Sequence, residues 1–197
     1  MPFICPCYSC LIILKLRPNS SLPTLSSYLT ETHTIIPLIL QVPPIDPSTS
    51  LRTTLLLRLT GEVMTSALTY KPKTETLSQL LDWLNDLDKA WLTVLRSQVW
   101  DPEEGVGRDI VTLADGDVDN DSMIHSTLMN QTERTRLRSL LVTGAARLEE
   151  WLELFLVPEG EDYNDVLERL GLRQGFDELF YESVKEIDVL DDAEGKS

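Results

Sequence analysis

The sequence contains few of the residues that build disulfides, metal centres and catalytic sites. Among its 197 residues are three cysteines and two histidines, and all the cysteines lie near one end: Cys5, Cys7 and Cys10. An odd number of clustered thiols cannot hold a domain together, so we expect no disulfide framework. A zinc site would lack its fourth ligand, because both histidines are remote in sequence. We interpret the cysteines as incidental thiols and expect no cofactor; a soft metal or a lipid bound there is the alternative.

Common catalytic motifs are missing as well. The chain has no G-x-G-x-x-G, G-x-x-x-x-G-K-[ST], G-x-S-x-G or H-E-x-x-H pattern. His125 is the single histidine beyond residue 50, and it falls in an expected loop without a visible acid–base partner. We therefore predict a protein that is not an enzyme, and keep an enzyme of unrecognised type as the third hypothesis.

The first 50 residues contain no long apolar run. Their apolar stretches lie at residues 11–14 and 35–42, and Pro37 interrupts the second. Both are far shorter than the roughly 20 residues needed to cross a bilayer. A secretory signal would place basic residues before its apolar stretch, whereas Lys15 and Arg17 follow it. We expect an intracellular protein, nuclear or cytoplasmic.

Basic residues are scarce relative to acidic ones. The chain has 17 Lys and Arg against 32 Asp and Glu, which gives a formal net charge of −15. So acidic a chain repels phosphate backbones and anionic lipids, and we expect neither nucleic acid nor membrane as a partner. Residues 149–194 hold 16 of the acids and three bases, a net charge of −13. This concentration supports a second hypothesis, an acidic binder of basic ligands such as histone tails or basic peptides.

Residues 1–50 differ in composition from the rest of the chain. They contain eight of the 11 prolines and 12 Ser or Thr residues, a density that opposes both helix and strand. We predict that residues 1–50 form a disordered tail. Because residues 64–67 read Met-Thr-Ser-Ala, an ordinary start, an alternative is that residues 1–50, or even 1–63, are a wrongly assigned extension.

From residue 51 onward the apolar residues recur at helical spacing. The pattern predicts an acidic helical domain over residues 51–190, with helices at about 51–69, 77–99, 131–157, 163–170 and 175–190. We expect Asn130 and Asp162 to cap two of them, and residues 191–197 to fray. The predicted fold class is all-α: an irregular helical bundle of three long helices plus a C-terminal helical pair, preceded by the disordered tail.

The second helix has the clearest pattern. Its apolar seam follows a 3-4-3-4-3 spacing: Leu77, Leu80, Leu84, Leu87, Trp91 and Val94. Thr76 and Gln79 fit a capping box at its start. Further apolar residues widen the stripe: Leu81, Trp83, Leu92 and Leu95. A helix this apolar is expected to be covered on two sides.

This second apolar row is the basis of the first function hypothesis. Four or five helices of this length leave apolar surface over, and such a surplus is typical of helix-in-groove interfaces. We therefore predict a non-catalytic adaptor or subunit that binds a protein partner through Leu81, Trp83, Leu92 and Leu95, and a homo-oligomer is compatible with it. Trp91 is expected in the core and Trp83 at the edge of the stripe. The alternative is that the whole row is core.

A long polar connection is expected at residues 101–130. Within it, Asp115, Asp117, Asp119 and Asp121 occupy positions 1, 3, 5 and 7 of a calcium-loop pattern. Position 6 is Asn120 where the turn requires Gly, and position 12 is Ser126 where a bidentate Glu is needed. We predict no metal site, with these four aspartates as a weak calcium candidate.

The third helix has an unusual charge distribution. Its first half is basic, with Arg134, Arg136 and Arg138, and its second half is acidic, with Glu149 and Glu150. This order is unfavourable for the helix dipole. We infer that, if it has a role, it serves an interaction outside the helix itself.

Overall fold

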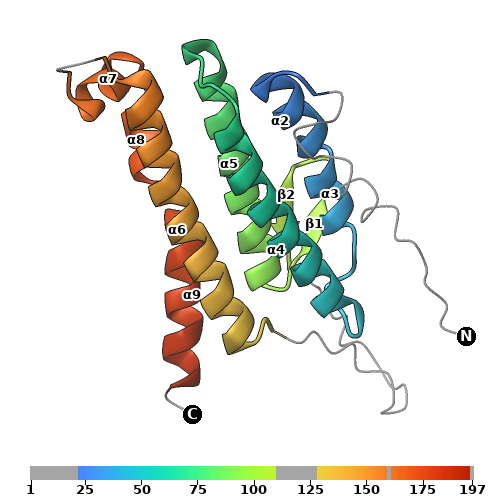
Figure 1. Cartoon of the computed structure of the whole chain (residues 1–197). Helices are drawn as coiled ribbons and strands as arrows, with labels where there is room; N and C mark the ends of the chain where they lie inside the picture. Colours follow the sequence, from blue (N-terminus) through green and yellow to red (C-terminus); the bar gives the residue numbers. More distant parts are fainter. Residues whose placement is uncertain (1–21, 110–127, 159–160, 196–197) are drawn as a thin grey trace, which may run out of the picture.

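Helices dominate the structure, a computed structural model that describes residues 22–109, 128–158 and 161–195. The all-α fold class is confirmed (Figure 1). The helices are α2 (Leu25–His33), α3 (Ile35–Leu40), α4 (Ser48–Ser66), α5 (Thr74–Leu95), α6 (Gln131–Leu156), α7 (Tyr163–Arg169), α8 (Arg173–Asp177) and α9 (Tyr181–Glu194). A short 3-10 turn, η1 (Ala67–Thr69), follows α4, and the strands β1 (Val99–Asp101) and β2 (Val106–Arg108) follow α5.

Four helices form the central bundle. The chain runs along α4, returns along α5, runs along α6 and returns along α9 (Figure 1). Each of these helices packs on two others, in the cyclic order α4, α6, α9, α5. The pair α2–α3 lies on the other side of α5 and also contacts α4. The bundle therefore carries an additional helical layer on one side.

Helix α5 provides most of the contacts that join these layers. All six residues of its predicted seam are buried, each at most 4% exposed. The indole Nε1 of Trp91 donates a hydrogen bond to Thr60 Oγ1 of α4 at 3.1 Å. The predicted capping box is wrong, because the helix begins at Thr74, with Lys73 as N-cap. The Thr76 hydroxyl instead donates to the Lys73 carbonyl.

The prediction that residues 1–50 lack regular structure is wrong for residues 25–40. Thr24 caps α2 through a capping box with Ser27, and Tyr28, Leu29 and Ile39 are each 1% exposed within the main core. The prolines do not prevent this, because they fall where a helix tolerates them. Pro37 is the third residue of α3, where its missing N–H has no intrahelical partner to lose. Residues 1–21 lie outside the described residues.

The alternative that residues 1–63 are a wrongly assigned extension also conflicts with the structure over residues 22–63. Met64 lies inside α4 and is 6% exposed. A chain that began there would lack α2, α3 and most of α4, and the apolar face of α5 that they cover would be exposed. The folded unit therefore begins well before residue 51.

Helices α6 and α9 are antiparallel and complementary in charge. The side chain of Arg134 is fully buried and donates to Met129 O at 2.6 Å, Asp191 at 2.7 Å and Glu194 at 2.5 Å. Arg138 pairs with Asp188 one helical turn further along α6. Two arginines of the basic half of α6 thus pair with acidic residues of α9, which accounts for their position in this unfavourable charge order. The predicted fraying of residues 191–197 is wrong for Asp191 to Glu194.

Two helix starts agree with the sequence. Asn130 accepts a hydrogen bond from the backbone N–H of Glu133, whose side chain accepts one in return, and Asp162 caps α7. The last predicted helix is divided, however. Helix α8 ends at Asp177, and the buried Phe180 adopts a left-handed φ of 59° before α9 begins.

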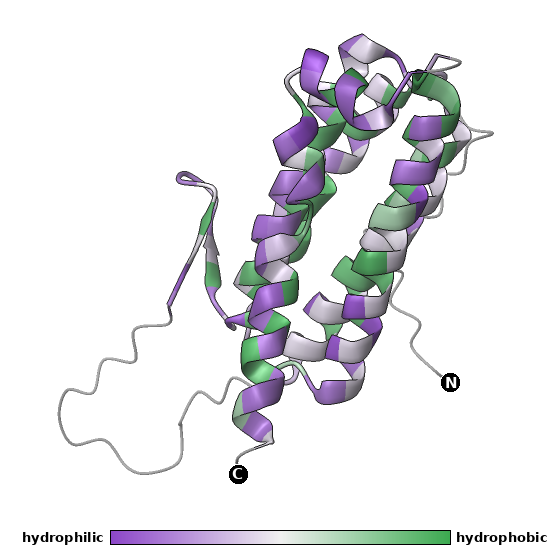
Figure 2. Ribbon diagram, turned by 90° about the vertical axis from the view of Figure 1, so that its left-hand side faces the viewer, coloured by the Kyte–Doolittle hydropathy of each residue, from purple (hydrophilic) through white to green (hydrophobic). Residues whose placement is uncertain are grey.

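The expected polar connection at residues 101–130 includes most of a β-hairpin, which the sequence pattern did not predict. Strands β1 and β2 pair antiparallel, with Trp100 opposite Gly107. The Asp101 carboxylate accepts hydrogen bonds from the backbone N–H groups of Glu103 and Glu104 in the turn. Figure 2 shows the hairpin projecting from the side of the bundle.

The described helices contain no span that is long and apolar enough to cross a membrane.

The core role of α3 can be tested with two neighbouring substitutions. Ile39→Ala, at a side chain that is 1% exposed, should lower the free energy of unfolding by about 2–5 kcal/mol. Leu38→Ala, at a side chain that is 47% exposed, should lower it by less than about 1 kcal/mol. Urea unfolding followed by circular dichroism measures both. Equal small effects would show that residues 25–40 are not part of the core.

Candidate functional site: a cationic groove between α4 and α6

The residues predicted to bind a partner lie mainly in the core. Trp83 is 2% exposed, Leu95 is 0% exposed and Leu81 is 9% exposed, whereas Leu92 is half-buried. Trp83 belongs to the main core, and α2 packs against the same helix. The prediction that this row faces a partner is therefore wrong for Trp83, Leu95 and Leu81. Its apolar surplus is largely covered by the chain itself.

Side-chain hydrogen bonds fix α2 on α5. Gln79 Nε2 donates to Thr30 Oγ1 at 3.2 Å, and His33 Nε2 lies 2.9 Å from an Asp86 carboxylate oxygen. His33 and Lys89 hold the pKa of Asp86 below its usual value, despite the opposing effect of burial, which is the largest single influence. The covered face of α5 is therefore held by polar contacts as well as by apolar packing.

The remaining site residues considered from the sequence lie outside the described residues. They are the aspartates of the calcium pattern, His125 and all three cysteines. Within the described ranges, no three His, Cys, Asp or Glu side chains lie together where they could hold a metal ion.

A large open groove lies between α4 and α6, with a volume of about 810 Å³. Its apolar floor contains Leu57 and Gly61 of α4 and Leu140 of α6. Its α6 wall is polar but mostly uncharged: Gln131, Thr132, Thr135, Ser139 and Thr143. None of these residues was predicted as a site from the sequence.

Two glycines shape this groove. Gly144 lies just beyond one end of the α6 wall, where a Cβ atom would meet Met64 Cγ of α4 at 3.1 Å. The missing side chain therefore lets the two helices approach closely at that point. Gly61 lines the floor, and a Cβ atom there would have only Leu140 Cδ1 nearby, at 3.9 Å. The space above Gly61 is consequently open.

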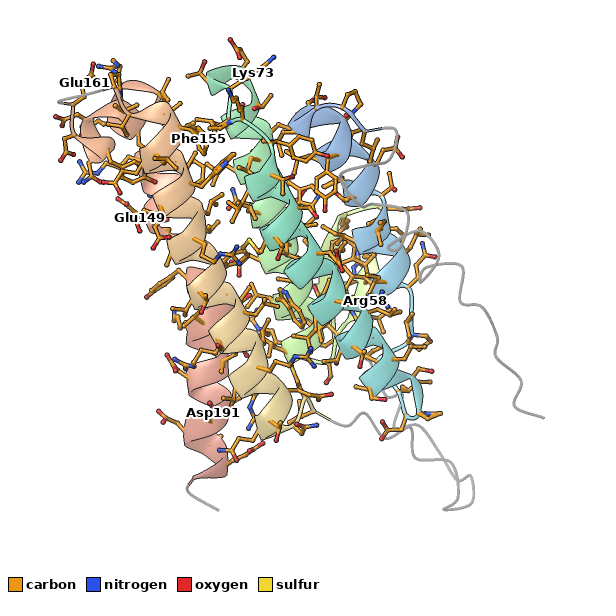
Figure 3. All side chains as sticks on the ribbon, viewed as in Figure 1. Arg58, Lys73, Glu149, Phe155, Glu161 and Asp191 are labelled. Carbon is orange, nitrogen blue, oxygen red and sulfur yellow. The ribbon has the colours of Figure 1, made fainter. Side chains whose placement is uncertain are left out.

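Arginines flank the apolar floor on both sides. Arg58 projects from the middle of α4 (Figure 3), and Arg136 projects from α6. Both are exposed, and neither has an ion pair within the described ranges. Six other arginines of the described ranges do have carboxylate partners: Arg96, Arg108, Arg134, Arg138, Arg169 and Arg173. Glu62 is the only acidic residue in the lining, so the groove is cationic in a strongly acidic protein.

The chemistry of the groove is suited to binding. Its lining contains hydroxyls, an amide, two guanidinium groups and one carboxylate, but no histidine or cysteine. The Thr135 hydroxyl donates to the Gln131 carbonyl of its own helix. Such a surface can bury an apolar face and pair with carboxylates at its edges.

Comparisons with protein-family models, with curated proteins and with solved structures each find no match to this chain.

Alanine at the two glycines tests the geometry of the groove. Gly61→Ala should raise the free energy of unfolding by about 0.5–1 kcal/mol, because alanine favours a helix and its Cβ fits the open space. Gly144→Ala should give a smaller gain or a loss, because Met64 must move. Urea denaturation measures both values. Equal gains would contradict the close approach of α4 and α6 at Gly144.

Proposed function

We propose that this protein is a non-catalytic helical adaptor or subunit whose α4–α6 groove binds an amphipathic helix of a partner protein, with acidic residues beside the apolar face of that helix. The proposal depends on one observation: an apolar floor lies between Arg58 and Arg136, two exposed arginines without carboxylate partners in the described ranges. The partner-binding residues of this proposal replace those expected from the sequence.

The dimensions of the groove favour a helical ligand. Its α6 wall extends from Gln131 to Thr143, which corresponds to about 18 Å along a helix at 1.5 Å per residue. Three turns of a ligand helix would match this length and place apolar residues at i, i+3, i+4 and i+7 on the floor. An apolar groove between two parallel-lying helices thus accepts a third helix as an extension of the bundle.

Charge favours an acidic ligand. Carboxylates on both sides of the ligand's apolar face would pair with Arg58 and Arg136, for which the chain itself supplies no partner in the described ranges. Charge complementarity of this kind contributes mainly to specificity and to the rate of association. A basic helix would be disfavoured because it would bring like charges together at both edges.

The acidic-binder hypothesis has less support from the C-terminal acids. Seven carboxylates in residues 149–194 are already in ion pairs within the chain: Glu161, Glu168, Asp177, Glu186, Asp188, Asp191 and Glu194. These pairs lower the negative charge that is free to attract a basic ligand. We therefore keep this function as the second candidate.

The proposal is tested with a designed peptide probe. The probe is a helical peptide with leucine at i, i+3, i+4 and i+7 and glutamate on both sides, and its twin carries lysine in place of glutamate. We expect the acidic probe to bind the full chain and the basic twin to bind at least about tenfold more weakly. The double variant Arg58→Glu, Arg136→Glu should lower the affinity for the acidic probe by about tenfold, measured by fluorescence anisotropy.

A matched control uses another arginine of α6. Arg147 is also exposed and without an ion pair in the described ranges, but it does not line the groove. Arg147→Glu should change the affinity for the acidic probe by less than about twofold, because Arg147 lies beyond Thr143, the last α6 residue that lines the groove. Equal weakening by Arg147→Glu, or equal binding of both peptides, would refute the proposal.

A further inference from the structure

A second, smaller pocket lies between α6, α7 and α8 and has a different chemistry from the groove. It has a volume of about 300 Å³. Two aromatic rings, Tyr163 and Phe176, and two carboxylates, Glu149 and Asp177, are among its lining residues. These four residues come from three helices, so the pocket exists only in the folded chain.

Small residues and a tight helix contact create the space. Ala145 and Ala146 supply part of the α6 wall, where longer side chains would fill the cavity. Helix α8 is held close to α5, because a Cβ atom on Gly175 would lie 2.4 Å from Leu81 Cδ2. This contact fixes the position of the neighbouring Phe176.

The electrostatic environment of the pocket is negative. Burial, with smaller contributions from the charges of Glu149, Asp177 and Glu153, raises the pKa of Tyr163 to about 12. Glu149 is exposed and has no ion pair within the described ranges. The negative charge of Asp177 is partly compensated by Arg173, whose Nε lies 3.5 Å from the Asp177 carboxylate. The same guanidinium group also pairs through Nη1 with Glu168 at 3.0 Å, so it is shared between two carboxylates.

We propose that this pocket binds an alkylammonium group, as presented by a lysine side chain of a basic peptide or by its methylated form. A cation beside aromatic rings is attracted by their negative faces, and carboxylates at the rim add a charge interaction. The methylene chain of such a ligand would lie along the alanine wall. The site is separate from the α4–α6 groove and does not depend on the function proposed for it.

Other ligand classes fit the pocket less well. A hard metal ion such as calcium takes six to eight oxygen ligands, and the described residues contain no cluster of three or more acidic, His or Cys side chains that could hold a metal. An anion would be repelled by Glu149 and Asp177. A neutral apolar ligand would leave the Glu149 carboxylate without a partner within the described ranges. An organic cation is the class that uses both the rings and the charges.

The test uses butylammonium and butyltrimethylammonium as probes, with 1-butanol as the neutral control. Titration of the 15N-labelled full chain at constant ionic strength should shift the amide signals of Ala145, Ala146 and Phe176. We expect saturable binding of at least one cation below about 50 mM, and at least about threefold weaker binding of butanol. Tighter binding of butylammonium would indicate an unmodified lysine as the ligand, and tighter binding of butyltrimethylammonium would indicate a methylated lysine. Binding of butanol equal to that of both cations, or no saturable shift, would overturn the proposal.

Two glutamates in consecutive positions give the matched variants. Glu149→Gln removes a charge that lines the pocket and should lower the affinity for the tighter-binding cation by about two- to fivefold. Glu150→Gln removes the same charge from an exposed position outside the lining and should leave the affinity within about 1.5-fold. Circular dichroism confirms that both variants fold. Equal weakening by the two variants would show a general charge effect and would refute the assigned site.

Discussion

The structure depends on the need to cover helix α5 on more than one side. Its buried residues include both the Leu77 to Val94 seam and the second row with Trp83 and Leu95. No single neighbouring helix can cover so wide an apolar surface. Helices α4 and α9 cover one part, and α2 and α3 cover another. The positions of α4 and α9 follow from this requirement, and the α4–α6 groove lies at the side of the bundle that α5 does not fill.

Charge then selects the partner of α6 within the bundle. The buried Arg134 forms three hydrogen bonds, two of them to carboxylates of α9, and so compensates the cost of removing a guanidinium from water. Arg52 of α4 shows the opposite case. Its side chain is buried, Nη1 donates a hydrogen bond to Gln98 O, Nε and Nη2 have no partner among the described residues, and burial lowers its pKa to about 10. The α6–α9 interface is thus electrostatically matched, whereas the contact of α4 with the loop after α5 is not.

The sequence predicts the helices well where one element contains the whole signal. The seam of α5 and the Asn130 capping box need no tertiary information. The helices in residues 25–40 were not predicted, because the prediction used the number of prolines. Whether a helix tolerates a proline depends on its position, and Pro37 lies in the first turn of α3. The groove could not be predicted either, because Gly61 and Leu140 meet only after α4 and α6 pack. The glycine at 61, within an apolar helix, was the available signal.

The arrangement around α5 also has a kinetic consequence. Gln79 bonds to Thr30 across 49 residues, and Ser183 bonds to Asp88 across 95 residues. Both sides of α5 are therefore completed by segments that are distant in sequence, so long loops must close before the apolar surface is covered. Simple helical bundles with local contacts fold rapidly, and this topology departs from them. Until α2 and α9 have docked, α5 exposes a wide apolar surface, which makes a partly folded chain prone to aggregation.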